Sequence, residues 1–325
     1  MRPVDAIPLD EIRSARKRIV GFAIRTPLVR LNVENSPAEI YLKLENLQPI
    51  GSFKVRGAAN AMRLCTVDEL ANGVYTASAG NMAQGVAFVA RRLGVRCSAI
   101  VPDHAPETKL SAIDRLGAEV VRVPFDDWWS VIVTHRFEGL CGRFIHPVTD
   151  PAVIAGNGTI GLEILEDLPD VDAIVIPYGG GGLSCGIASA VRALKPDTKV
   201  YAAEIETAAP LAASLAAGEP REIQYTPSFV DGIGGKSVLA QMWPLVQDLV
   251  DGSLVVSLLQ TAGAIRLLAA RNHIIAEGAG ATSVAAALAG LAGGKKIVSV
   301  VSGGNIDAAT LCTILNEKMP KCVES

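Results

Sequence analysis

One lysine has a sequence context suited to covalent chemistry. Lys54 lies in the segment Gly51–Gly57, which reads GSFKVRG. Apolar residues at helical spacing follow it and predict a helix with Lys54 in its first turn, namely Val55, Ala58, Ala59 and Met62. The positive end of that helix dipole would lower the pKa of Lys54. A lysine with a lowered pKa is suited to forming a Schiff base with a carbonyl group.

A run of four glycines predicts an anion-binding loop. It follows an apolar strand ending near Ile176 and precedes a helix starting near Leu183, and it consists of Gly179, Gly180, Gly181 and Gly182. Successive glycines let backbone N–H groups converge at the positive end of a helix, which suits a phosphate. A flexible turn is the alternative. The run lacks the third glycine of the dinucleotide fingerprint.

A second glycine pattern has a different interpretation. The segment Gly156–Gly161 reads GNGTIG and fits the spacing of the dinucleotide fingerprint. It follows Asp150-Pro151, however, which is typical of a helix start and not of a strand end. We therefore interpret it as part of a helix.

Two polar loops resemble each other in design. Ser78–Asn81 and Ser302–Asn305 each follow a predicted strand and open a helix. Ligands of open α/β folds bind at the carboxyl ends of strands, so we expect both loops to meet the glycine run at one cleft. Ordinary helix capping would explain either loop alone.

Strand and helix patterns alternate along the chain, which predicts an α/β fold with largely parallel sheets. A compact βαβ unit is expected between residues 73 and 146, and a second sheet is expected from the later strands joined by the first 65 or so residues. The predicted strands are 74–77, 95–101, 120–123, 144–146, 173–177, 200–203 and 296–301.

Composition excludes several classes of protein. Half of the 325 residues are hydrophobic and 19% are charged, with a net charge of -3, which indicates a large core. No basic tract is present, so we expect no nucleic-acid partner. The longest uncharged run, 278–294, is interrupted by glycines and predicts a buried helix, not a membrane span. The N-terminus shows no secretory pattern, so we expect a cytoplasmic protein.

Cysteine and histidine spacing argues against a metal enzyme. The four histidines form no H-E-x-x-H motif, and the cysteines form no C-x-x-C pair. We predict reduced core thiols at positions 65, 97, 141, 185, 312 and 322.

Taken together, the motifs resemble those of a known family. Lys43–Asn46, Gly51–Ala58, Ser78–Ala87, the glycine run and Ser302–Asn305 occur in the order and spacing of the threonine/serine dehydratase and serine racemase family. These are pyridoxal phosphate (PLP) enzymes of fold type II, and the nearest resemblance is to threonine ammonia-lyase. The resemblance implies a two-domain α/β fold like that of the tryptophan synthase β subunit, with open, twisted, mostly parallel sheets and helices on both faces. Residues 1–68 and 149–325 would form the large cofactor-binding domain and 69–148 a small mobile domain, with the active site between them.

The resemblance also implies how the cofactor would be held. Lys54 would bind PLP covalently as an imine, between Phe53 on one ring face and Gly232 near the other. Asn81 would hydrogen-bond the 3'-oxygen, and Ser302 would face the pyridine nitrogen. The phosphate would lie against Gly179, Gly180, Gly181, Gly182 and Leu183.

For the substrate, the resemblance implies that its carboxylate binds Ser78 and the loop formed by Ala79, Gly80, Asn81 and Met82. Lys54, once released, would remove the Cα proton, and the cofactor phosphate would help protonate the departing hydroxyl. The expected reaction converts threonine or serine to a 2-oxo acid and ammonia. Because a serine at position 302 does not keep the pyridine nitrogen protonated, fast elimination is favoured over reprotonation.

Departures from the family pattern leave two alternatives open. Ala79 replaces the serine that serves as the second base of racemases, which disfavours an isomerase. Met82 replaces a usual histidine and Val148 an aromatic or amide residue, so a bulkier substrate such as phenylserine is the first alternative. Trp128 or Trp129 could line such a pocket, although neighbouring residues of a helix cannot both face it.

Two further expectations follow from the resemblance. Metal-dependent relatives use a glutamate, a backbone oxygen and an aspartate, for which this chain has Glu204, Ala208 and Pro210. Because proline offers no carboxylate, we expect no metal. The family is usually dimeric or larger, so we expect a homodimer.

Overall fold

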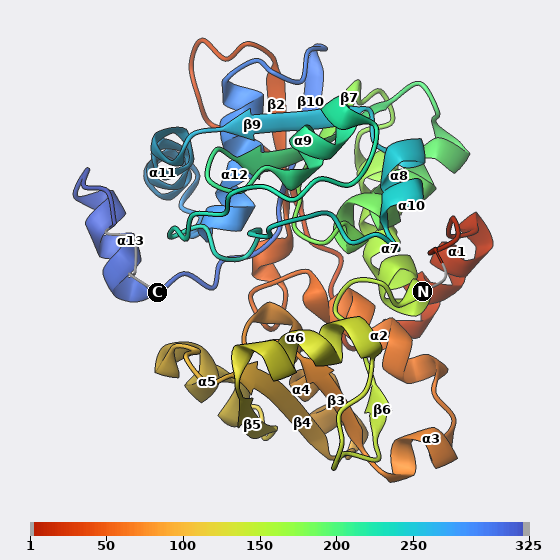
Figure 1. The fold of residues 1–325 in the computed structure, drawn as a ribbon. Coiled ribbons are helices and arrows are strands. Elements are labelled where there is room, and N and C mark those ends of the chain that lie inside the picture. The colour runs from red at the N-terminus through yellow and green to blue at the C-terminus, as the bar shows by residue number, and fades with distance from the viewer. Residues whose placement is uncertain (1–2, 321–325) are drawn as a thin grey trace.

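The computed structural model describes residues 3–320, which contain two separate sheets. The larger has six strands in the order β1-β2-β10-β7-β8-β9, and every neighbouring pair is parallel except β1 and β2. These strands lie in the upper half of Figure 1. Their bounds are β1 (Leu28–Arg30), β2 (Glu39–Leu44), β7 (Ala173–Pro177), β8 (Lys199–Ile205), β9 (Gly252–Val256) and β10 (Lys296–Val301).

The smaller sheet has four parallel strands in the order β5-β4-β3-β6 and lies in the lower half of Figure 1. Its strands are β3 (Val74–Ala77), β4 (Cys97–Pro102), β5 (Glu119–Val123) and β6 (Arg143–Phe144). Around it lie α3 (Val67–Ala71), α4 (Asn81–Leu93), α5 (Glu107–Asp114) and α6 (Phe125–Thr134). The unit is the βαβ arrangement predicted for residues 73–146.

Helices cover both faces of the six-stranded sheet. On one face a core joins Ile174 and Val298 to α1, α7, α8 and α10, and on the other a core joins Val175 and Ile297 to α11, α12 and α13. This arrangement confirms the predicted α/β fold. The helix bounds are α1 (Leu9–Arg18), α7 (Pro151–Asp167), α8 (Gly182–Leu194), α9 (Pro210–Ala217), α10 (Trp243–Leu249), α11 (Leu258–Leu267), α12 (Gly278–Leu288) and α13 (Ala308–Leu315).

Helix α2 (Lys54–Leu64) packs against both halves of the molecule, on α7 and on α4. Its contact with α7 depends on glycines, because a Cβ at Gly156 would lie 2.5 Å from the carbonyl oxygen of Arg56. The GNGTIG segment is therefore the interior of α7, as predicted. The helix begins at Pro151, and Asp150 caps it by accepting a hydrogen bond of 2.8 Å from the backbone N–H of Ala152.

Three of the predicted strands, 74–77, 173–177 and 296–301, match β3, β7 and β10 to the residue, and the others differ at their ends by one or two residues. The helix predicted from the uncharged run 278–294 is too long, because α12 ends at Leu288 and the backbone turns at Gly290 with φ 71°. Among residues 3–320, no helix combines the length and hydrophobicity that crossing a membrane requires.

The prediction that the cysteines are core thiols is only partly right. Cys97 and Cys185 are buried, but Cys65 is half-buried, and Cys141 and Cys312 are exposed. Cys141 lies in the loop before β6 and Cys312 on the outer face of α13, which are surface positions irrespective of residue type. All five are free thiols. Cys322 lies outside the described residues.

Candidate active site

Lys54 is the first residue of α2, within the first turn as predicted. Its Nζ donates a hydrogen bond of 3.0 Å to the carbonyl oxygen of Pro147 and lies 5.2 Å from the ring centroid of Phe53. Burial lowers the pKa of Lys54 to about 8, and the charge of Glu277 acts in the opposite direction. Desolvation, and not the helix dipole that the sequence suggested, is therefore the main cause.

Neighbouring loops fix the start of α2. The backbone N–H of Phe53 donates to the carbonyl oxygen of Ser302 at 3.0 Å, and that of Gly304 donates to the carbonyl oxygen of Gly51 at 2.9 Å. Gly51 has φ 69°, a conformation that favours glycine. The loop after β10 thus holds the loop that presents Lys54.

His146 fixes the acceptor of the Lys54 hydrogen bond, a role that its sequence context did not reveal. Its Nδ1 accepts hydrogen bonds from the backbone N–H groups of Val148 at 3.0 Å and Thr149 at 2.8 Å. Burial lowers the pKa of His146 to about 3, which keeps the ring neutral and able to accept. The turn at Pro147 is therefore held rigid beside Lys54.

A buried charge network anchors α2 beneath the cleft. Arg56 donates to Glu45 at 2.8 Å and to Glu163 at 2.7 Å, and Lys43 donates to Glu163 at 2.6 Å. All four side chains are at most 5% exposed, and two positive charges balance two negative ones. The Lys43–Asn46 motif thus has a positioning role, because its charges lock β2, α2 and α7 together.

The glycine run connects β7 to α8, with Gly182 as the first residue of that helix. Gly181 has φ 95°, and a Cβ at Gly180 would lie 2.5 Å from a methyl carbon of Val148. Nearby, the hydroxyl of Ser184 is buried without a hydrogen-bond partner among the described residues. A helix N-terminus, a narrow backbone cradle and an unsatisfied hydroxyl fit a bound phosphate group.

The two polar loops meet, although they belong to different sheets. Asn81 donates a hydrogen bond of 2.9 Å to Glu277, and Asn305 donates one of 2.7 Å to the side-chain oxygen of Asn81. Their strands β3 and β10 lie in separate sheets, in keeping with the two units predicted from the sequence, and the two loops meet as expected.

Glu277 is the acidic residue that the sequence analysis missed. It directly precedes α12 and is 8% exposed. Burial and the nearby charge of Asp231 raise its pKa to about 8. Its only sequence signal was a lone carboxylate at the start of a long uncharged run. Gly232 lies close by, since a Cβ there would be 3.7 Å from a Glu277 oxygen.

The expected substrate loop follows β3 and opens α4. Ser78 accepts a hydrogen bond of 3.2 Å from the backbone N–H of Gly80, and Ala79 is half-buried. Met82 differs from expectation, because its side chain is 1% exposed and packs in the core around Val55 and Val86. Only the backbone of Met82 is therefore placed to serve the cleft.

The two tryptophans separate as helix geometry requires. Trp128 packs against the core around Tyr75 and Val123, whereas Trp129 is 43% exposed. The carboxylate of Glu204 is occupied by the start of α9, because it accepts from the backbone N–H groups of Leu211 at 2.9 Å and Ala212 at 2.8 Å. Among the described residues no group of three potential ligands could hold a metal ion.

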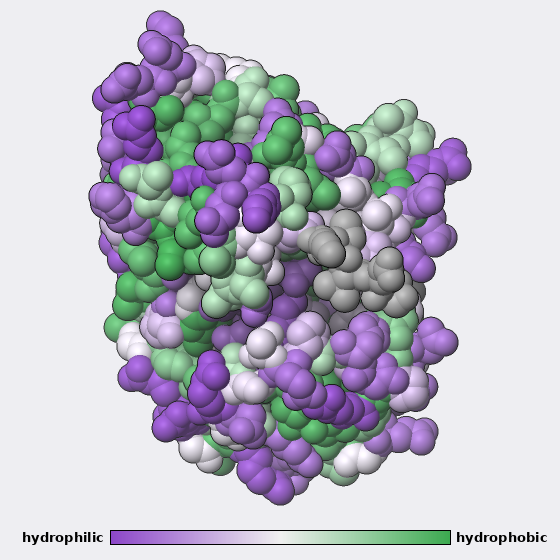
Figure 2. Space-filling view, turned by 90° about the vertical axis from the view of Figure 1, so that its left-hand side faces the viewer, coloured by the Kyte–Doolittle hydropathy of each residue, from purple (hydrophilic) through white to green (hydrophobic). Residues whose placement is uncertain are grey.

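These elements surround a hydrophilic hollow between the two halves of the molecule, visible about midway up the face in Figure 2. Its chemistry combines an amine with a lowered pKa, a phosphate cradle and amide and carboxyl groups from both sheets.

Comparisons with known proteins identify the family. A family model described as pyridoxal-phosphate dependent enzyme matches residues 19–303. L-threonine ammonia-lyase of Thermotoga maritima is 40% identical over 97% of this chain and 80% of its own. The catabolic L-threonine dehydratase TdcB of Escherichia coli K12 is 38% identical over 95% of this chain and 96% of its own.

Solved structures of a serine racemase and a threonine deaminase share the fold of this chain. Maize serine racemase superimposes with a TM-score of 0.87 at 31% identity, covering 96% of this chain and 98% of that one. The processed form of threonine deaminase isoform 2 from Solanum lycopersicum superimposes with a TM-score of 0.84 at 32% identity, covering 97% and 98%. On its motifs, its fold and these matches, the chain belongs to the family of pyridoxal-phosphate-dependent enzymes, in the threonine/serine dehydratase and serine racemase group.

Proposed function

We propose that the protein is a PLP-dependent ammonia-lyase that eliminates water from threonine or serine to give a 2-oxo acid and ammonia. The observation that carries the proposal is the amine of Lys54, with a pKa of about 8, held beside a glycine cradle for phosphate. The relatives at about 40% identity carry threonine ammonia-lyase or dehydratase names.

The bound cofactor would supply an electron sink for the carbanion formed when the Cα proton leaves. This chain would supply the groups around it. Lys54 accepts the proton because burial makes its amine a usable base near neutral pH. Phe53 would pack against one face of the cofactor ring and Gly232 would leave room at the other, while Ser302 would offer a hydroxyl to the ring nitrogen.

Ser78 and the backbone of residues 79–82 would bind the substrate carboxylate, because N–H groups at the start of α4 attract an anion. Asn81 would orient the cofactor's 3'-oxygen, and Glu277 would position Asn81 through its hydrogen bond. Residues 179–183 would hold the phosphate.

We propose threonine and serine ahead of bulkier substrates. The case for phenylserine rested on Met82 and Val148, and Met82 is buried in a core. Val148 packs against Gly180 and Gly182, where it shapes the glycine cradle. An isomerase remains the second candidate, because solved racemases match this fold as well as deaminases do. Ala79 argues against it, since a methyl group cannot deliver a proton to the opposite face of Cα.

The test is 2-oxo acid release from L-threonine, L-serine and L-threo-phenylserine at equal concentration in the presence of PLP. We expect turnover of threonine or serine by the native protein, and none by Lys54→Ala. Borohydride reduction followed by peptide mapping should label Lys54. Turnover by Lys54→Ala would contradict the proposal, and recovery of the D-enantiomer without 2-oxo acid would establish the isomerase.

We also propose that residues 69–148 move as a small domain relative to 1–68 and 149–325. Support comes from the separate sheets and from an ion pair between Lys109 of α5 and Asp231, which crosses the cleft next to Gly232. The test is hydrogen exchange with and without substrate analogue, in which protection should increase at α5 and at residues 231–234.

We propose a homodimer. Support comes from large apolar side chains exposed on the upper half, among them Leu259, 64% exposed, and Ile275, 52% exposed. Light scattering on the purified protein should give twice the chain mass of 33.9 kDa, and the monomer mass would refute the proposal.

We propose a cytoplasmic location, which the five free thiols among residues 3–320 support, because reduced cysteines suit a reducing compartment. Fractionation of the source cells, followed by immunodetection, would test it.

A further inference from the structure

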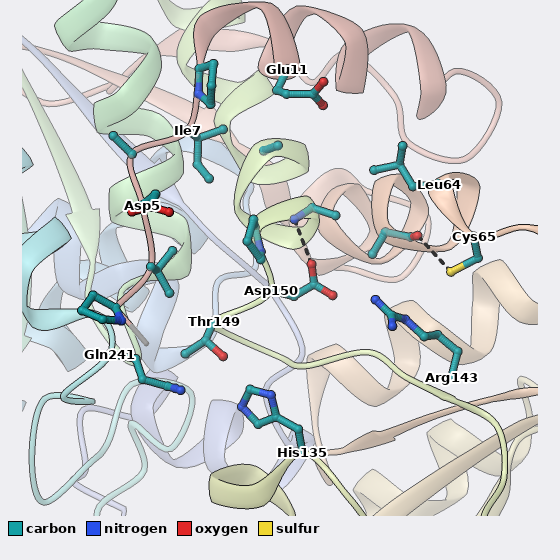
Figure 3. A pocket seen from close by; sticks show the side chains of 18 of the residues that line it. Asp5, Ile7, Glu11, Leu64, Cys65, His135, Arg143, Thr149, Asp150 and Gln241 are labelled. Atoms are coloured by element: carbon teal, nitrogen blue, oxygen red, sulfur yellow. Dashed lines mark hydrogen bonds between the residues drawn. The ribbon is translucent and has the colours of Figure 1, made fainter. Parts of the chain in front are cut away.

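A second cavity, of about 780 Å³, lies apart from the cleft. Figure 3 shows it between the N-terminal segment with Asp5 and Ile7, the end of α2 at Leu64 and Cys65, and the loop that leads into α7. None of the residues expected to hold cofactor or substrate lines it. The proposed reaction therefore gives this cavity no role.

Two opposite charges face each other in this cavity without forming an ion pair. Figure 3 shows the guanidinium of Arg143 pointing towards the carboxylate of Asp150. Burial raises the pKa of Asp150, and the positive charge of Arg143 opposes this effect without cancelling it. Their charged atoms are not within the 4.0 Å of an ion pair. Other carboxylates of the lining have partners, since Glu11 pairs with Arg18 and Glu69 accepts from the backbone N–H of Thr66.

Two polar atoms of the lining are unsatisfied. The hydroxyl of Thr149, a residue 6% exposed, and Nε2 of His135 are buried with no hydrogen-bond partner in the described part of the chain. Both residues line the cavity beside Asp150. A buried polar atom without a partner is costly unless a ligand or water supplies one.

The remaining lining combines apolar side chains, among them Ile7, Ala61, Leu64, Ala152 and Ala155, with Gln241 and the partnered carboxylates of Asp5, Glu11 and Glu69. A ligand that fits must therefore carry a cation for Asp150, an anion for Arg143 and a compact apolar body between them. A simple anion would meet the negative charge of Asp150, and a simple amine would meet the positive charge of Arg143. A ligand with both charges satisfies each group.

We propose that this cavity is a binding site for a small zwitterion, with its ammonium on Asp150 and its carboxylate on Arg143, and with Thr149 and His135 as further polar groups of the lining. The site is separate from Lys54 and would not require covalent attachment. Its occupancy can therefore be measured whether or not the proposed reaction is correct.

L-Proline is the probe of choice. It carries both charges on a compact apolar ring, and its secondary amine cannot form the neutral imine that primary amino acids form with an aldehyde. Pyrrolidine and cyclopentanecarboxylate are matched controls that each lack one of the two charges. Binding to the PLP-loaded protein is measured by titration calorimetry, with an expected dissociation constant on the order of 1 mM.

Variants locate the binding. Arg143→Gln removes the proposed anion partner, and Asp150→Asn removes the carboxylate while keeping a side chain that caps α7. Each should weaken L-proline binding about tenfold or more, because each removes a charge-assisted hydrogen bond. Arg122→Gln is the control, since Arg122 is a surface arginine of the same half that pairs with Glu107.

The expected result is L-proline binding that is lost in Arg143→Gln, retained in Arg122→Gln and absent for both one-charge analogues. Absence of L-proline heat, equal binding by Arg143→Gln, or equally tight binding of either analogue would each overturn the proposal. If Asp150→Asn does not fold, the Arg143→Gln result alone tests the proposal. We expect Arg143→Gln to fold, because Arg143 is exposed and caps no helix.

Discussion

Asn305 donates a hydrogen bond of 2.7 Å to the side-chain oxygen of Asn81, and this contact joins loops that follow strands of two different sheets. Asn81 in turn donates to Glu277, so one amide side chain connects the small sheet to the start of α12. Polar side chains from the two halves of the molecule therefore meet at this point of the cleft.

The rate of PLP attachment should depend on the ionisation of Lys54. Only the neutral amine attacks an aldehyde, and burial lowers the pKa of Lys54 to about 8. The rate constant for cofactor uptake by the apoprotein should rise about tenfold per pH unit below pH 8 and level off above it. Stopped-flow absorbance measures this rate. A bend near pH 10, the ordinary range of a lysine amine, would contradict the expectation.

Glu277 should make the apoprotein less stable as the pH rises. Its pKa is raised from 4.5 to about 8, so the folded state holds a proton that the unfolded state has already released. The free energy of unfolding should therefore fall between about pH 4.5 and 8. Urea unfolding of the apoprotein should show a smaller fall in Glu277→Gln. Glu219→Gln, an exposed control, should behave like the native protein, and identical pH profiles for Glu277→Gln and the native protein would show that Glu277 ionises normally.

Breaking the buried charge network should be costly. Glu163→Gln leaves Lys43 and Arg56 buried without a full counter-charge, and we expect a loss of roughly 3–5 kcal/mol in the free energy of unfolding. Glu166→Gln is a matched control on the same helix, because Glu166 is exposed and pairs with Arg16 and Arg25 at the surface. It should cost about 1 kcal/mol or less. Equal losses in chemical denaturation would mean that the network does not stabilise the fold.

The close contact of α2 and α7 should not tolerate a methyl group. Gly156→Ala would place a Cβ 2.5 Å from the carbonyl oxygen of Arg56, so we expect destabilisation of about 1–3 kcal/mol. Gly263→Ala in α11 should stabilise the protein by up to about 1 kcal/mol, because the new Cβ meets only a distant Arg266 side-chain atom at 3.9 Å. Thermal melts of both variants measure the difference, and similar melting temperatures would rule out tight packing at Gly156.

Chelation should leave activity unchanged. The carboxylate of Glu204 already accepts hydrogen bonds from Leu211, Ala212 and Ser253, and Pro210 offers no side-chain ligand. Turnover of threonine should therefore be equal before and after dialysis against EDTA. A loss restored by Mg²⁺ would show that the carboxylate leaves α9 to bind a metal.

The sequence alone determined the local chemistry of the protein. A strand, a glycine run and a helix start predict a turn at residues 179–183 whose N–H groups suit a phosphate, because N–H groups and glycine torsions are local properties. Lys54 at the start of α2, the cap at Asp150 and the α/β alternation were predicted for the same reason. Side-chain periodicity and helix capping depend on residues that are close in the sequence, so both can be predicted from the sequence.

Burial, pKa values and hydrogen-bond partners depend on contacts between distant segments, so only the tertiary structure decided them. Burial, not helix position, lowers the pKa of Lys54, and burial raises that of Glu277, because desolvation depends on the packing of the whole cleft. The same packing places Met82 in a core and Cys141 at the surface, and it brings Asn81 to Asn305 across two sheets. A pattern of residue types fixes which groups are present, whereas their pKa values and partners follow from how closely the folded chain surrounds them.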